Sequence, residues 1–290
     1  MTDHCAFQTL ITAPELLRNS SNPDWLVIDC RHDLSDPQAG RAAYQGNHIP
    51  GAVFAHLDAD LAGEKLGADG SFRGRHPLPQ SEQFIDTLRR LGVNQRTQVV
   101  AYDAHGGMFA ARLWWMLRWV GHAQVAVLDG GLQGWSAAGG TLEAQVPVAV
   151  AGDITLRAPL VSTVSMAQLV ANLHDPRLTV LDARAADRYR GENETLDPVG
   201  GHIPGAKNRC FRDNLQADGR FKSAAQLHTE FASVLTSARD SVMQCGSGVT
   251  ACHNLLALEV AGMQGAALYP GSWSEWCSEP SRPISQGSVS

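Results

Sequence analysis

The sequence is short of long apolar runs and of positive charge. No stretch approaches the roughly 20 apolar residues of a membrane-spanning helix. The start, residues 1–5, lacks the basic residues and apolar core of a secretory signal. The net charge is −6, and no dense cluster of lysine and arginine is present. Neither nucleic acid nor a membrane is therefore an expected partner, and we expect a cytoplasmic protein.

Cysteine is also sparse. Six cysteines are scattered over 290 residues, which suits reduced thiols better than a disulfide framework. Cys245 and Cys252 are the closest pair along the chain, but their spacing does not match the paired cysteines of a zinc site. We therefore expect no metal.

What the sequence does contain is a long internal repeat. In each half, an apolar run ending in Asp-x-Arg is followed by His-Ile-Pro-Gly-Ala and later by a run that contains glycine and tryptophan. In the first half these three segments are 25–31, 48–52 and 129–135. In the second half they are 178–184, 202–206 and 270–276. The chain is predicted to be a tandem duplication, with domains at residues 1–140 and 160–290. The stretch 136–159, rich in Ala, Gly and Val, is the expected linker.

Each half alternates short apolar runs with helix-like segments. In the first half, strands are expected around Val27–Ile28, Val99–Tyr102 and Val125–Leu128, with a helix over Ala110–Val120. Strand, helix and strand in succession predict a parallel sheet covered by helices on both faces. Functional sites in such α/β sheets lie beyond the carboxyl ends of the strands.

Cys245 ends a strand-like run and precedes a glycine-rich turn and a helix-like stretch. Unpaired N–H groups at the start of a helix stabilise an anion, so this placement favours a reactive thiolate. Gly246 and Gly248 would let those N–H groups turn inward. A buried structural cysteine is the alternative. Aligning the two halves puts Asp103 at the cysteine position of the first half, which we therefore expect to be non-catalytic.

These motifs resemble the tandem-domain rhodanese family of sulfurtransferases. The run Cys-Gly-Ser-Gly-Val-Thr-Ala at 245–251, both His-Ile-Pro-Gly-Ala segments and Gly-Ser-Trp-Ser-Glu-Trp at 271–276 carry the resemblance over nearly the whole chain. It implies two tandem rhodanese-like domains, each a mainly parallel sheet flanked by helices. The cysteine loop is most similar to those of 3-mercaptopyruvate sulfurtransferases, because thiosulfate-specific members usually carry basic residues where Gly246 and Ser247 stand here.

The resemblance implies covalent sulfur transfer. Cys245 would take sulfur from a small-molecule donor, 3-mercaptopyruvate or alternatively thiosulfate, and become a persulfide. A thiol, a thioredoxin-like protein dithiol or cyanide would then accept the sulfur. Backbone N–H groups of the loop would hold the persulfide without a metal or an organic cofactor. The expected donors come from Gly246, Gly248, Val249, Thr250 and Ala251.

Proton transfer is expected to use Ser247, since removing sulfur from mercaptopyruvate leaves an enolate. The resemblance adds His76 and Asp58 from the first half, which implies a site between the domains. Without the resemblance, His76 reads as a loop histidine before a proline, and Asp58 as a helix-capping carboxylate.

Binding of the donor's anionic end is expected to use Arg190, which matches an arginine of the family; its alternative role is that of a surface arginine. The mercaptopyruvate pattern has a second arginine where this sequence has Thr195. Either Arg209, Arg212 or Arg75 replaces it, or the preferred donor differs.

Two other classes of function stay open at this point. A cysteine phosphatase would need an arginine at the end of the cysteine loop, where the sequence has Ala251. A non-catalytic scaffold or sulfur-carrier module would need the tandem fold alone. His48 and His202 begin equivalent motifs in both halves, so a structural role is favoured for them.

Overall fold

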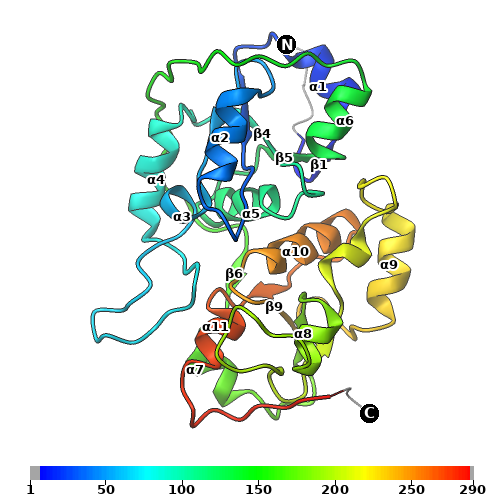
Figure 1. Cartoon of the computed structure of the whole chain (residues 1–290). Helices are drawn as coiled ribbons and strands as arrows, with labels where there is room; N and C mark the ends of the chain where they lie inside the picture. The colour runs from blue at the N-terminus through cyan, green and yellow to red at the C-terminus, as the bar shows by residue number, and fades with distance from the viewer. Residues whose placement is uncertain (1–6, 288–290) are drawn as a thin grey trace. The chain divides into compact units, whose positions relative to one another are not determined.

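The computed structural model describes residues 7–287, so Cys5 and the rest of residues 1–5 lie outside the described residues. Within that range the chain forms two compact units, each with a five-stranded parallel sheet (Figure 1). The first unit holds residues up to 62, 79–160 and 216–221, and the second holds the remainder. The α/β class predicted from the sequence is confirmed. The domain limits at 140 and 160 stay a prediction, since segments 63–78 and 216–221 pack with the unit from the other half of the chain.

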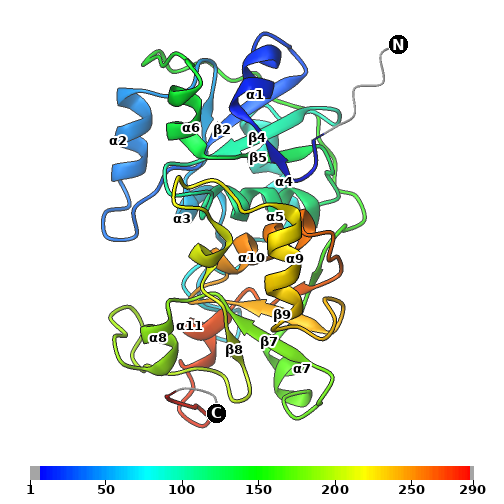
Figure 2. The ribbon, with the colours of Figure 1, turned by 90° about the vertical axis from the view of Figure 1, so that its right-hand side faces the viewer.

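The first unit has the strand order β1-β5-β4-β2-β3. Figure 2 shows α1, α2 and α6 on one face of this sheet and α3, α4 and α5 on the other. Its elements are β1 (Leu10–Ile11), α1 (Ala13–Asn19), β2 (Trp25–Asp29), α2 (Ala39–Gly46), β3 (Val53–Phe54), α3 (Leu57–Asp60), α4 (Ser81–Arg90), β4 (Gln98–Tyr102), α5 (Ala110–Trp119), β5 (Val125–Leu128) and α6 (Gly131–Ala137).

The second unit has the equivalent order β6-β10-β9-β7-β8. Figure 2 shows α9 and α10 on one face and α7, α8 and α11 on the other. Its elements are β6 (Ser162–Thr163), α7 (Met166–Ala171), β7 (Thr179–Asp182), α8 (Ala186–Arg190), β8 (Lys207–Asn208), the 3₁₀ helix η1 (Phe211–Asn214), α9 (Ala224–Ala232), β9 (Ser241–Gln244), α10 (Thr250–Val260), β10 (Ala267–Leu268) and α11 (Ser272–Trp276).

The central strands explain why the sequence folds this way. Every residue of β4 and of β9 is buried, as expected for a parallel sheet covered on both faces. The amphipathic α4 turns Phe84, Ile85 and Leu88 towards the core, whereas nearly the whole of α10 is buried. Both central strands are therefore buried as far as their carboxyl ends.

The register of the two sheets supports the internal repeat. In the first sheet Asp29 of β2 lies opposite Tyr102 of β4, and in the second Asp182 of β7 lies opposite Gln244 of β9. The residue that follows β4 and the residue that follows β9 therefore occupy equivalent positions, as the sequence alignment predicted.

The histidines of the two His-Ile-Pro-Gly-Ala segments make matching contacts. Nδ1 of His48 lies 2.7 Å from the carbonyl oxygen of Tyr44, and the two rings stack with centroids 4.2 Å apart. His202 repeats this arrangement on Tyr189, with distances of 2.9 and 3.8 Å. These contacts support the structural role predicted for both histidines.

The cysteines in the described part of the chain are free thiols: Cys30, Cys210, Cys245, Cys252 and Cys277. Burial raises the pKa of Cys277 to about 11, and burial likewise raises the pKa of Cys30 well above its usual value. Among residues 7–287, no helix has both the length and the apolar character needed to cross a membrane.

Candidate active site

Cys245 stands directly after β9, the central strand of the second sheet. The N–H of Gly248 donates a hydrogen bond to its Sγ over 3.1 Å, from a turn in which Gly248 has a φ of +77°. Helix α10 begins at Thr250, so the sulfur lies at the amino-terminal end of a helix. Such a position stabilises a negatively charged sulfur. Cys245 is 2% exposed, so a donor must enter the loop to reach it.

The first unit fills the same position with an anion of its own. The Asp103 carboxylate accepts hydrogen bonds from the N–H groups of His105, Gly107, Phe109 and Ala110 over 2.7–3.0 Å. The loop after the central strand therefore gathers backbone donors around a negative side chain in the first copy as well. Asp103 saturates its loop and offers no sulfur nucleophile.

His76 and Ser247 are in direct contact. Nδ1 of His76 lies 2.8 Å from Oγ of Ser247, and both side chains are buried. His76 belongs to the 63–78 segment, which packs within the second unit. Ser247 was expected from the sequence and His76 from the family resemblance, and the structure joins them into one hydrogen-bonded pair.

Two guanidinium groups approach the cysteine loop at Gly246. A methyl group built on Gly246 would lie 2.8 Å from Nη2 of Arg75 and 3.6 Å from Nη2 of Arg188. A side chain at position 246 would therefore require the end of the Arg75 side chain to shift. The family arginine that is absent at position 195 had three possible replacements. Of these three, Arg75 lies next to Gly246.

The other two replacements are engaged elsewhere in the second unit. Nη2 of Arg209 donates to Asn214 and Glu230, each over 2.9 Å. The guanidinium of Arg212 lies 5.8 Å from the centre of the Phe211 ring.

Arg190, which the sequence suggested as the donor-binding arginine, lies in a different environment. Its Nε and Nη2 bind the carboxylate of Glu192 over 2.7 and 2.6 Å, on a partly exposed part of the unit. Arg188 sits on the same short helix, α8. Residues two apart on an α-helix point about 200° away from each other, so one of them faces the loop and the other turns away. The arginine near the loop is Arg188, and the assignment to Arg190 is corrected on that geometry.

Both loop arginines are held by carboxylates. Nε and Nη2 of Arg188 bind Glu194 over 2.7–3.1 Å, and Arg75 forms an ion pair with Asp197. Burial raises the pKa of Asp197. Burial acts to raise the pKa of Glu194, but the hydrogen bonds and charge of Arg188, together with the N–H groups of Leu196 and Asp197, outweigh burial and the pKa is lowered. An anionic donor must therefore share these guanidinium groups with two carboxylates.

Ser272 is a site residue that the sequence analysis missed. Its Oγ accepts a hydrogen bond from the N–H of Cys245 over 3.1 Å and donates one to the carbonyl of Tyr269 over 2.9 Å. Among residues 7–287 it is the single non-glycine residue with a positive φ, +53°, and the equivalent Gly131 has the same φ. The signal was present in the repeat, where a serine replaces a glycine at a position that favours glycine.

Asp58 lies on α3 of the first unit with a side chain 37% exposed, and its predicted closeness to Cys245 stays a prediction. Within the described residues, His32, His56 and Asp58 form the one group of candidate metal ligands. Nε2 of His56 lies 2.9 Å from the carbonyl of Pro37, and its Nδ1 accepts the N–H of Asp58 over 3.1 Å. Both ring nitrogens of His56 are therefore engaged by backbone groups.

Comparison with known proteins identifies the family. The model of the rhodanese-like domain matches residues 12–138 and again residues 165–279. The chain belongs to the rhodanese family. The resemblance predicted from the cysteine loop and the repeated motifs is therefore confirmed, and so is the prediction of two tandem rhodanese-like domains.

Rhodanese-family relatives match over nearly their full length. A probable 3-mercaptopyruvate sulfurtransferase of Pseudomonas aeruginosa is 47% identical, with 96% of this chain and 98% of the relative covered. A putative thiosulfate sulfurtransferase of Mycobacterium tuberculosis is 39% identical, with 97% and 98% covered. Among solved structures, SseA of Escherichia coli, a 3-mercaptopyruvate sulfotransferase, matches with a TM-score of 0.79 and 31% identity, covering 92% of this chain and all of that one.

Proposed function

We propose that this chain is a sulfurtransferase that moves sulfur from 3-mercaptopyruvate to a thiol or cyanide through a persulfide on Cys245. The observation that carries the proposal is the pairing of a nucleophile with a proton relay. The Cys245 sulfur accepts the N–H of Gly248 just before α10, and the hydroxyl of Ser247, two residues along the chain from Cys245, is bonded to His76. We expect the transfer to take place in the cytoplasm, where thiols stay reduced.

The first half-reaction breaks the C–S bond of the donor. The Cys245 thiolate attacks the mercaptopyruvate sulfur, an S–S bond forms, and the C–S electron pair passes into the enolate of pyruvate. The donor's thiol proton finally resides on the carbon, so that pyruvate leaves and the persulfide keeps the negative charge. Ser247 and His76 are placed to carry that proton.

The second half-reaction regenerates the thiolate. A thiolate acceptor, including a thioredoxin-like protein, or cyanide attacks the outer sulfur, the S–S bond breaks, and its electron pair returns to Cys245. The outgoing persulfide or thiocyanate carries the charge away. The Gly248 N–H, with those of Gly246, Val249, Thr250 and Ala251, would stabilise the persulfide without a cation that would hold it permanently.

Arg188 and Arg75 supply the anion-binding end of the proposed site. Nε and Nη2 of Arg188 are bonded to Glu194, while its Nη1 has no hydrogen bond within the described residues. A carboxylate can bind such a free edge of a guanidinium. Thiosulfate is the second candidate donor, because its sulfonate end suits the same arginines and Thr195 interrupts the mercaptopyruvate pattern.

The test combines kinetics with mass spectrometry. Both donors are compared at steady state with cyanide as the acceptor, and the donor-treated enzyme is digested and searched for an adduct of about 32 Da on Cys245. We expect the adduct and turnover in the native chain and in Cys252→Ser, and neither in Cys245→Ser. A Cys245→Ser enzyme that still turns over either donor would refute the mechanism.

A further inference from the structure

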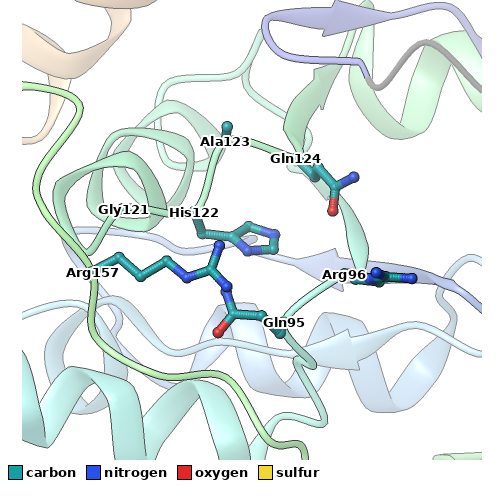
Figure 3. Close-up of a pocket in the computed structure, with 7 residues that line it drawn as sticks. All are labelled: Gln95, Arg96, Gly121, His122, Ala123, Gln124 and Arg157. Carbon is teal, nitrogen blue, oxygen red and sulfur yellow. The ribbon is translucent and has the colours of Figure 1, made fainter.

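A cavity lies in the first unit, away from the strand ends that carry the Asp103 loop. It has a volume of about 410 Å³ and is lined by Gln95, Arg96, Gly121, His122, Ala123, Gln124 and Arg157. Its walls precede β4 and β5, so it opens at the amino-terminal edge of the sheet, opposite the edge that holds Asp103. In Figure 3, Arg157 reaches into the cavity from the chain that follows α6, and Arg96 lies on the far side.

The two arginines of this cavity are not neutralised by carboxylates. Neither Arg96 nor Arg157 forms an ion pair or a side-chain hydrogen bond within residues 7–287. Asp153 is bonded to the N–H of Gln95 over 2.9 Å and pairs with neither arginine. In a chain with a net charge of −6, two unpaired guanidinium groups around one cavity are a local excess of positive charge.

Backbone contacts fix the position of Arg157. Its N–H donates to the carbonyl of Val120 over 3.1 Å. Three residues further on, the N–H of Leu160 donates to the carbonyl of Arg118 over 3.0 Å. A methyl group built on Gly121 would lie 2.6 Å from Cβ of Arg157, so the glycine permits this close approach. The backbone at Arg157 is therefore anchored, and the exposed side chain extends from it.

The polar side chains of the cavity are also oriented. Oε1 of Gln95 accepts hydrogen bonds from the N–H and the hydroxyl of Thr155 over 3.2 and 2.8 Å, which leaves its NH₂ group as a donor. Nε2 of His122 lies 2.8 Å from the carbonyl of Thr97, so that nitrogen carries a proton. Burial lowers the pKa of His122, so the positive charge near neutral pH comes from the arginines.

We propose that this cavity is a binding site for a small tetrahedral oxyanion of the phosphate or sulfate class, free or as the ester of a small metabolite. Arg96 and Arg157 supply charged donors from two sides, and the Gln95 amide supplies a neutral one. Donors from separate elements surround a tetrahedral group better than a flat one. The volume exceeds that of a single oxyanion and lies within the range of small-molecule pockets, so an organic group has room.

Isothermal titration calorimetry of the full chain tests the site with inorganic phosphate, sulfate, glycerol 3-phosphate and acetate at constant ionic strength. We expect saturable binding of the tetrahedral anions with a Kd of about 1 mM or lower. Arg96→Gln and Arg157→Gln should each raise that Kd at least about tenfold. Tighter binding of the ester would assign an organic ligand, and equal binding would assign the free oxyanion.

Arg18→Gln is the matched control, since it removes one exposed positive charge from α1, which does not line the cavity. Its Kd should equal that of the native chain, and thermal unfolding should show all three variants folded. Absence of saturable binding, equal weakening by Arg18→Gln, or acetate bound as tightly as phosphate would each overturn the proposal. Sulfur transfer is not the readout, so the result stands apart from the function proposed for Cys245.

Discussion

Nδ1 of His76 lies 2.8 Å from Oγ of Ser247, although the two residues come from opposite halves of the sequence. Both side chains are buried. A hydroxyl held by an imidazole can pass a proton in either direction, because each partner can donate and accept. The pair therefore suits a step in which a carbanion or enolate next to Cys245 must be protonated.

The first prediction concerns this relay. Ser247→Ala and His76→Gln should each lower kcat with 3-mercaptopyruvate by about 10²-fold, the range expected for one acid–base group. With thiosulfate the loss should be much smaller, since the sulfite that leaves is a stable anion and no carbon needs a proton. Steady-state assays with both donors measure the difference.

The double variant provides the control for this prediction. Two groups that act as one relay are not additive, so Ser247→Ala with His76→Gln should be little worse than either single variant. Equal losses with the two donors would contradict a role in protonation.

The second prediction separates the two arginines of α8. Arg188→Gln should raise KM for 3-mercaptopyruvate by about tenfold or more, because it removes a charged donor beside the loop. Arg190→Gln removes the same charge two residues away, where the side chain is paired with Glu192, and KM should hardly change. If Arg190→Gln had the larger effect, the placement of α8 would have to be revised.

The outline of the fold could be predicted because buried strands and a repeat leave strong signals. The fully buried β4 and β9 read as apolar runs, and the repeat identified Asp103 as the counterpart of Cys245. The same signals could not decide between Arg188 and Arg190, since both stand in one short basic run. Helix geometry, which turns residues two apart in different directions, made that choice.

Contacts between segments far apart in the chain were the other feature that the sequence could not predict. The N–H of Arg75 donates to Oγ of Ser274 over 3.1 Å, which ties the 63–78 segment into the second unit. This segment has few helical or strand residues, so its sequence carries no periodicity from which to predict a partner. Family resemblance suggested His76, but the structure was needed to show that Arg75 accompanies it to the loop.

The third prediction concerns Ser272, a positioning residue. Ser272→Gly relieves a backbone conformation that is costly for serine but loses the hydroxyl bonded to the Cys245 N–H. We therefore expect the melting temperature to change little while kcat falls about tenfold with both donors. Paired thermal unfolding and kinetics measure the two effects.

Ser278→Ala is the control, since it deletes an exposed hydroxyl just beyond α11. It should leave the melting temperature and kcat unchanged. A loss of stability that matched the loss of activity would point to a merely structural serine.

The fourth prediction concerns Asp103 in the first unit. Asp103→Ala leaves four backbone N–H groups without their acceptor in a buried loop. The free energy of unfolding should fall by about 3 kcal/mol or more, since each buried donor left unpaired is costly. Asp103→Asn retains one oxygen acceptor and should lose less stability. Urea unfolding gives the stabilities.

The value of kcat/KM per folded molecule should stay near the native value in both variants, because Asp103 closes its own loop and offers no sulfur. A drop in kcat/KM without a drop in stability would instead assign Asp103 a direct part in sulfur transfer.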